Sequence, residues 1–230
     1  MIDWAKAQAA LTRAGYWCGK PDGRDGPLTY TALFAFAAGR QPDAVLRAIG
    51  TAAANWLSGD AITLTPARLA EFVAQTAHET GGYRCFEEDL RYSAATLLKQ
   101  WPAHFTPAQA AACAGKPVDI ACRAYAGRMG NEAALDGWTY RGRGMLQLTG
   151  RANYAAFGKA LGLDLINHPE LAADPGDSLV IAREFWRRGQ VNDAIDRGDF
   201  LKARQITNGA SAIGLADVAR RRAQLLGVLA

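Results

Sequence analysis

The chain has 230 residues, half of them hydrophobic, which allows one sizeable core with a small appended module but not two full domains. Its 26 basic and 22 acidic residues give a net charge of +4. This charge suits contact with an anionic polymer, without the dense basic stripe of a nucleic-acid-binding protein, and ordinary surface charge explains it equally well. The apolar stretch from Ala32 to Ala38 is too short to cross a bilayer, so we expect no stable membrane insertion.

The first residues do not resemble a signal peptide, because Asp3 and Lys6 interrupt the first turn and no long apolar segment follows. We therefore expect synthesis in the cytoplasm, and an external substrate would be reached only after another agent opens the membrane.

Cysteine and histidine are sparse: Cys18, Cys85, Cys113, Cys122, His78, His104 and His168. No CxxC pair is present, which excludes a zinc cluster of the usual spacing, and we expect neither a metal nor a cofactor. Thiols of cytoplasmic proteins mostly stay reduced, so buried free thiols are favoured. A Cys113–Cys122 disulfide is the open alternative.

Apolar residues recur mostly at helical spacing, without sustained alternation, and this predicts a mainly α fold. The first helix is expected over 2–14, ended by Gly15, and a turn rich in Gly, Pro and Asp at 19–27 leads to a second helix over about 29–38. Further helices are expected at about 43–57, 66–80, 93–100, 107–114, 118–127, 151–161, 176–188 and 216–229.

The first forty residues carry a recognisable pattern: Ala10-Leu11, Gly15-Tyr16, Asp22-Gly23, Gly26-Pro27-Leu28-Thr29, Ala32-Leu33 and Phe36. It resembles a short peptidoglycan-binding helical repeat found beside many wall hydrolases, although a clear third helix is lacking. The resemblance implies a module at 1–40 followed by a catalytic domain at 41–230. The alternative is that residues 1–40 are a subdomain of the catalytic body.

Glu79 stands in the last turn of the expected 66–80 helix, which begins with a Thr65 cap and Pro66 and ends at Gly81-Gly82. The carbonyl end of a helix dipole disfavours negative charge, so we expect this carboxyl to hold its proton longer than a free Glu does. Such a group can act as a general acid, whereas a lone glutamate here is most often just exposed.

Glu88 follows nine positions later, and on one continuous helix the two carboxylates would face apart. The double glycine breaks the helix, so we expect both to face one cleft, as an inverting glycosidase requires with its carboxyls about 6.5–9.5 Å apart. Glu87 and Asp89 are alternatives that spacing does not separate. A zinc protease motif is excluded because Gly82 stands where HExxH needs its second histidine.

Five segments together form a larger pattern: 74–83 (AQTAHETGGY), 128–131 (RMGN), 136–150 (DGWTYRGRGMLQLTG), Asn153-Tyr154 and 206–209 (ITNG). They resemble glycoside hydrolase family 19, which holds plant-type chitinases and many bacteriophage endolysins, and the central block is similar to the endolysin branch. The resemblance spans about residues 45 to 230. It implies a mainly α, lysozyme-like fold with a deep cleft and an inverting mechanism.

By position, the resemblance implies that Glu79 is the general acid, Glu88 the general base, and Thr149 a hydroxyl that holds the attacking water. It places Gln147 and Asn208 among the substrate contacts, and amides suit the donor and acceptor of an N-acetyl group.

Four further side chains complete the expected substrate site. They are His78, Trp138, Tyr140 and Arg221. The two aromatic rings would stack on sugars, with core packing an equal alternative. Within the basic run 220–222 the register is ambiguous, and we assign Arg221 to the arginine that the family pairs with its active-site carboxylates; a solvated helix face is the alternative. Ala210, where the family has a second glycine, leaves the local turn open.

We therefore expect a monomeric endolysin that cleaves the β-1,4 bonds between N-acetylmuramic acid and N-acetylglucosamine of peptidoglycan and so lyses a host cell. A chitinase of the same family is the first alternative. It is less favoured, because plant-type chitinases usually carry a secretion signal and several disulfides. A non-catalytic wall-binding protein is the second alternative, although such proteins usually lose one acid and both are present here.

Overall fold

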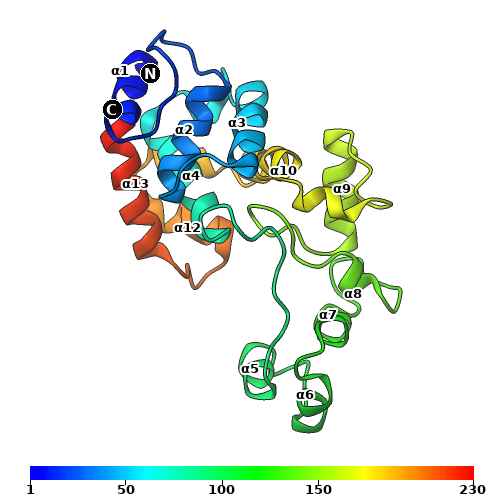
Figure 1. Cartoon of the computed structure of the whole chain (residues 1–230). Coiled ribbons are helices and arrows are strands. Elements are labelled where there is room, and N and C mark those ends of the chain that lie inside the picture. The colour runs from blue at the N-terminus through cyan, green and yellow to red at the C-terminus, as the bar shows by residue number, and fades with distance from the viewer. The chain divides into compact units, whose positions relative to one another are not determined.

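A computed structural model describes residues 1–230 and is built almost entirely of helices, which confirms the expected mainly α fold (Figure 1). The chain divides into two compact units. Unit 1 comprises Met1–Phe86, Gly144–Leu146 and Asp174–Ala230. Its helices are α1 (Trp4–Arg13), α2 (Pro27–Ala38), α3 (Ala44–Trp56), the 3₁₀ helix η1 (Ala61–Thr63), α4 (Pro66–Glu79), α10 (Pro175–Arg188), α11 (Val191–Asp196), α12 (Phe200–Asn208) and α13 (Leu215–Leu229).

Unit 2 comprises Glu87–Arg143 and Gln147–Ala173. Its helices are α5 (Ala94–Gln100), α6 (Pro107–Cys113), α7 (Pro117–Ala124), α8 (Asp136–Thr139), α9 (Arg151–Leu161) and the 3₁₀ helix η2 (Pro169–Ala173). Instead of a sheet, the unit has two isolated β-bridges, which join Arg143 to Glu87 and to Leu148.

Most helices begin at a side chain that accepts a hydrogen bond from the first turn, which explains why the sequence located them well. Asp3, Asp43, Thr65, Ser93, Thr106, Asp174 and Asp199 all cap in this way. Glycine in the left-handed region ends α2 at Gly39 and α9 at Gly162. The ten helices expected from the sequence are present, in several cases with ends shifted by one to three residues.

Helices α8, α11 and α12 and both 3₁₀ helices were not expected. The first two have only four and six residues, too few to show a helical period. In α12 only Ala203 and Arg204 are buried, so no apolar stripe marks it.

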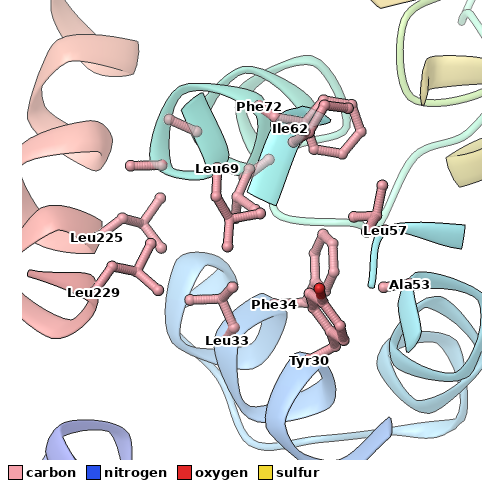
Figure 2. Packing of buried hydrophobic residues seen from close by; sticks show 14 of the residues in the cluster. Tyr30, Leu33, Phe34, Ala53, Leu57, Ile62, Leu69, Phe72, Leu225 and Leu229 are labelled. Carbon is pink, nitrogen blue, oxygen red and sulfur yellow. The ribbon is translucent and has the colours of Figure 1, made fainter. Parts of the chain in front are cut away.

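The core of unit 1 forms around α2, where seven consecutive residues from Thr29 to Ala35 are buried. Figure 2 shows Tyr30, Leu33 and Phe34 of this helix facing Leu69 and Phe72 of α4. Leu225 and Leu229 of α13 complete the same cluster. The apolar face of α4 is fully buried and comprises Leu69, Phe72, Val73 and Ala77, so α4 is held firmly and its C-terminal end is fixed.

Residues 1–40 pack within this same core. Ala7 and Leu11 of α1 are buried in the cluster, α1 contacts α13, and α2 contacts α3. These contacts place the segment in unit 1 together with residues 41–86. The division at residue 40, and the resemblance of the first segment to a wall-binding repeat, stay predictions.

Unit 2 has a smaller core made of α5, α6 and α7, with Leu90, Leu97, Phe105 and Ile120 buried. Trp101 sits among three aromatic rings, those of Tyr92, Phe105 and Tyr125, at centroid distances of 5.7–6.3 Å. This aromatic cluster holds the segment after Glu88 against α7.

The four cysteines are unpaired in the structure. Cys18 is buried as expected, but Cys85 is exposed and Cys113 and Cys122 are half-buried, so the expectation that all four are buried was wrong. No helix has both the length and the apolar character needed to cross a membrane.

Gly50 of α3 lies so close to α2 that a Cβ there would stand 2.7 Å from the backbone nitrogen of Thr31. We predict that Gly50→Ala lowers the free energy of unfolding by about 1–3 kcal/mol, because two buried backbones must separate. Gly227→Ala in α13 is the matched control, since open space surrounds that position and alanine favours a helix by about 1 kcal/mol. Urea denaturation measures both; equal stability of the two variants would contradict the close packing.

Candidate active site

Glu79 is the last residue of α4, as the sequence predicted. The helix ends there because Gly81 and Gly82 adopt positive φ angles of 57° and 76°, which residues with a side chain rarely take. The carboxylate is 17% exposed, so it is accessible at one side and held at the other.

Arg204 of α12 is the main partner of Glu79. Its Nη2 lies 2.5 Å from Oε1 of Glu79, and its guanidinium is fully buried. Asn208, at the end of the same helix, donates from Nδ2 to that oxygen at 3.4 Å. The buried Oδ1 of Asn208 has no hydrogen-bond partner. Asn208, expected as a substrate contact, thus lies beside Glu79.

A buried polar chain runs along α4 and ends at this pair. Glu71, Gln75 and Glu79 are spaced by four residues and therefore share one face of the helix. Gln75 donates to Glu71 at 2.9 Å and accepts from Arg204 at 3.3 Å, and Arg222 bonds to Glu71 at 2.9 Å. The buried carboxylate of Glu71 and the half-buried carboxylate of Glu79 are each matched by an arginine, as charges removed from water require.

His78 lies against Asp217 of α13, with 2.8 Å between Nδ1 and Oδ2. Partial burial alone would raise the pKa of Asp217, but hydrogen bonds from Arg221, His78 and Arg220 outweigh it and hold that pKa well below its usual range. Any side chain at Gly214 would overlap the imidazole ring. His78 is therefore fixed next to the expected acid by an anion and by a close backbone contact.

The expectation that Arg221 pairs with the catalytic carboxylate was wrong. Arg221 bonds to Asp217 at 2.7 Å and to the carbonyl of Ala37 at 2.9 Å, whereas Arg204 holds Glu79. No local pattern marks Arg204, because it stands 125 positions after Glu79 and only tertiary packing brings the two residues together. A role for Arg221 in substrate binding stays a prediction.

The turn after Asn208 differs from the glycine-rich pattern of the family. Gly209 takes a positive φ of 88°, and Ala212 takes a φ of 46° although it is not glycine. Both Nε and Nη2 of Arg204 donate to the carbonyl of Ile213, at 2.8 and 2.6 Å. The arginine therefore fixes this turn as well as Glu79.

Glu88 belongs to unit 2 and is held by two donors. The backbone N–H of Gly142 donates to Oε1 at 2.6 Å, and the hydroxyl of Tyr125 donates to Oε2 at 2.8 Å. Burial and the neighbouring negative charge of Glu88 raise the pKa of Tyr125 well above its usual value, so the phenol keeps its proton and remains a donor. Tyr125 was not identified from the sequence.

The two alternatives to Glu88 have different surroundings. Glu87 is exposed and forms ion pairs with Arg141 and Arg143, at 2.5 and 3.1 Å. Partial burial opposes the effect, but these two arginines lower the pKa of Glu87. Asp89 is exposed and caps the backbone of Arg91. Glu88 alone of the three is half-buried and held by neutral donors.

Gly142 permits a close approach of Glu88 and Gln147 to the backbone. A Cβ there would lie 2.7 Å from Oε1 of Gln147 and 3.3 Å from the carboxyl carbon of Glu88. Gln147, predicted to contact substrate, is therefore beside Glu88. The Thr149 hydroxyl donates to the carbonyl of Gln147 at 2.8 Å, and its role in holding a water stays a prediction.

The two aromatic residues predicted to stack on sugars, Tyr140 and Trp138, differ in their exposure. Tyr140 is only 5% exposed, packs edge-on against Tyr154, and donates to the carbonyl of Ile166 at 3.2 Å. The ring of Tyr140 offers no face to a sugar, so core packing, the alternative to sugar stacking, is correct. Trp138 is half-buried and carries the guanidinium of Arg141 over its ring at 3.9 Å.

Glu79 belongs to unit 1 and Glu88 to unit 2, so the expected meeting of the two carboxylates in one cleft stays a prediction. No group of three or more His, Cys, Asp or Glu side chains is arranged to hold a metal ion. A mainly α fold with two half-buried carboxylates, each fixed by neighbouring donors, is typical of a hydrolase that works by acid–base chemistry.

Comparison with protein families identifies the group. Residues 40–197 match glycoside hydrolase family 19, described as chitinase class I, and the chain belongs to that family. A glycosyl hydrolase family 19 domain-containing protein of Haemophilus influenzae is 44% identical over 121 residues, which cover 51% of this chain and 60% of that protein. Chitinase 8 of Oryza sativa subsp. japonica is 34% identical over 65% of this chain and 46% of its own length. The chain thus spans less than two thirds of these relatives.

Solved structures share the fold. Chitinase C from Streptomyces griseus HUT6037 aligns with a TM-score of 0.59 and 19% identity, covering 90% of this chain and 94% of that one. A bacterial family 19 chitinase aligns with a TM-score of 0.53 and 21% identity, covering 85% and 93%. At these identities the likeness establishes the mainly α fold of the family and nothing finer.

We predict that Arg204→Lys lowers kcat on the order of 10²-fold and changes KM little, because an ammonium has three donors and no planar fork and so cannot reproduce the four contacts that the guanidinium makes with Glu79, Gln75 and Ile213. Steady-state kinetics on a soluble oligosaccharide, with thermal unfolding to check the fold, measure this. Arg220→Lys is the control, since Arg220 is 57% exposed and pairs only on the surface. A variant that loses affinity but keeps kcat would contradict a role in positioning Glu79.

Proposed function

We propose that this chain hydrolyses β-1,4 glycosidic bonds between N-acetylmuramic acid and N-acetylglucosamine in peptidoglycan by an inverting general acid/base mechanism. The observation that carries the proposal is a pair of anchored, partly accessible carboxylates, Glu79 and Glu88, in a family 19 domain. Each is fixed by donors from a different part of the chain, which is the preorganisation that catalysis requires.

Glu79 is the proposed general acid. Arg204 and Asn208 both contact Oε1, which leaves Oε2 as the oxygen that carries the proton. The proton passes from Oε2 to the glycosidic oxygen while the bond from that oxygen to the anomeric carbon breaks. The leaving sugar departs with a new hydroxyl, and Glu79 becomes a carboxylate next to a guanidinium that stabilises its charge.

Glu88 is the proposed general base. It takes a proton from a water whose oxygen attacks the anomeric carbon from the opposite face, so the configuration inverts. Each carboxylate oxygen already accepts one hydrogen bond, from Gly142 or Tyr125, and retains a second lone pair for the water. Two neutral donors fix the carboxylate without pairing it with a cation, whereas Glu87 is committed to two arginines.

A chitinase is the second candidate, and the names of the relatives favour it, since the rice protein is called a chitinase and a tomato relative a basic 30 kDa endochitinase. The net charge of +4 favours the anionic peptidoglycan over uncharged chitin. A non-catalytic wall-binding protein is the third candidate, and the retention of both anchored carboxylates argues against it.

We further propose that the protein is a monomeric endolysin of the phage branch, made in the host cytoplasm and acting on the wall once the membrane is permeabilised. The block from Arg128 to Tyr154, which is similar to that branch, supports this role.

The first test is mass spectrometry of sugar fragments released from purified peptidoglycan. We predict disaccharide-peptide products from the wild type and none from Glu79→Gln or Glu88→Gln, because each near-isosteric change removes a proton transfer worth about 10²–10⁴-fold. Glu87→Gln is the matched control and should retain most activity. The sugar at the reducing end of the released fragments identifies which glycosidic bond is cleaved. Fragments from Glu79→Gln at the wild-type rate would place the acid elsewhere, and release from chitin alone would select the second candidate.

The second test addresses the lytic role. Purified protein added to cells with a permeabilised outer membrane should clear the suspension, and Glu79→Gln at the same concentration should not. Clearing by both proteins would indicate disruption without glycosidic cleavage. No clearing by the wild type, despite sugar release from purified walls, would contradict the endolysin role while leaving the hydrolase assignment intact.

A further inference from the structure

Unit 2 contains a cavity of about 600 Å³ that is lined by none of the residues assigned to catalysis. Its walls come from α7, from the last residue of α6 and from the turn after α5. The volume lies within the range of about 300–1,000 Å³ that is typical of small-molecule sites. The cavity is therefore a candidate for a second binding site within this unit.

One side of α7 and of the residues just after it forms most of the wall. The lining residues recur every three or four positions, so they stand on the same side of the helix: Asp119, Cys122, Arg123 and Ala126. Tyr125, whose hydroxyl donates to Glu88, is the cap residue of this helix. The helix that lines the cavity thus also positions the proposed general base.

Arg123 lines the cavity as a half-buried cation that forms no salt bridge. Its Nε is buried without a hydrogen-bond partner, and its guanidinium carbon lies 5.9 Å from the centroid of the Phe105 ring, a weak partner for a charge. A guanidinium partly removed from water is stabilised by an anion, and a carboxylate fits its planar fork. Arg123 therefore marks a carboxylate position in the cavity.

His104 adds a second donor to the cavity wall. Arg128 donates from Nη1 to Nε2 of His104 at 3.4 Å. Because arginine has no acceptor, Nε2 must accept, and the proton of the neutral ring is then on Nδ1. The same contact brings the positive charge of Arg128 next to His104, which further favours an anion on this side of the cavity.

Asp119 supplies the opposite charge one helical turn before Arg123, and the two side chains form no salt bridge with each other. An anion and a cation at this spacing are complementary to a ligand that carries an ammonium and a carboxylate on one carbon, as the free end of an amino acid does. The thiols of Cys113 and Cys122 give the wall apolar surface for the carbon chain that leads to those charges.

Peptidoglycan carries such a group, and chitin does not. Its strands bear short peptides on the lactyl ethers of N-acetylmuramic acid. In one class of wall a residue of this peptide is meso-diaminopimelic acid, whose distal end is a free amino acid group wherever it is not cross-linked. In another class the residue is lysine, which has the distal ammonium without the carboxylate.

We propose that this cavity binds the peptide stem of peptidoglycan, with Arg123 and His104 on the distal carboxylate of diaminopimelic acid and Asp119 on its ammonium. The cavity then selects diaminopimelic-type walls over lysine-type walls and over chitin. This inference deepens the proposed function and rests on its peptidoglycan substrate. Binding of a sugar-free peptide is measured without hydrolysis, so the two proposals fail separately.

The experiment is isothermal titration calorimetry of the wild-type protein with two sugar-free synthetic peptides, L-alanyl-γ-D-glutamyl-meso-diaminopimelic acid and the same peptide ending in L-lysine. The first should bind about tenfold more tightly or better, because only it offers Arg123 a distal carboxylate. Arg123→Gln should remove this preference, and Asp119→Asn should weaken the binding of both peptides. Lys159→Gln is the control, since Lys159 is an exposed cation of α9 outside the cavity.

Two further measurements separate binding from a structural role. Ala103→Phe keeps every charge but fills the cavity, so it should weaken both peptides while the melting temperature stays at the wild-type value. In the active protein, Arg123→Gln should raise KM roughly tenfold on glycan strands that carry peptides and leave it unchanged on strands stripped by an amidase.

Equal affinity of the wild type for the two peptides would overturn the proposal, as would an absence of binding or an equal loss with Lys159→Gln. A loss by Arg123→Gln on both kinds of glycan strand would assign Arg123 to the fold and also overturn it. Peptide binding without any cleavage of glycan would reject the proposed hydrolysis alone and leave the peptide site in place.

Discussion

The buried guanidinium of Arg204 is the constraint on which the acid side of the site depends. A fully buried arginine is tolerated only where acceptors meet its donors, and here Glu79, Gln75 and the carbonyl of Ile213 supply them. Since these acceptors come from α4 and from the turn after α12, satisfying one side chain fixes both segments. Glu79 is the anionic partner, and a buried charge pair of this kind depends on its partner far more than a surface ion pair does. The carboxylate of Glu79 is therefore positioned by the fold itself and not by its own rotamer preference.

Glu88 is also held in a fixed position, but by different contacts from those of Glu79. A backbone N–H and a phenol hold its two oxygens, and the first of these depends on Gly142, where a side chain would displace both Glu88 and Gln147. One carboxylate thus has a cationic partner and the other two neutral donors. Groups of the same chemical type placed in different surroundings can take opposite roles in proton transfer, as acid and as base. The neighbouring Glu87 forms ion pairs with Arg141 and Arg143, which is typical of a carboxylate with a structural role.

The N-terminal segment is an integral part of unit 1. Its inner residues, including Leu11, Tyr30 and Leu33, belong to the core of unit 1, so the segment cannot unfold without exposing that core. Gln8 in the same segment is buried, and its side-chain amide fixes the following turn through hydrogen bonds with Asp22, Gly23 and Arg24.

The sequence by itself determined ten of the helices, their ends to within three residues, and the family. Local signals do this: Thr65 and Pro66 start α4, Gly81 and Gly82 end it, and Glu79 is thereby placed at its last residue. The spacing of apolar residues sufficed for the α4 face, and the block from Arg128 to Tyr154 carried the family resemblance. Only the tertiary structure decided which arginine meets Glu79, which of three acidic neighbours is held by neutral donors, and that Tyr140 is buried. Capping and periodicity act over a few residues, whereas Asn208 and Glu79 are 129 positions apart, and such pairs form only after helices pack.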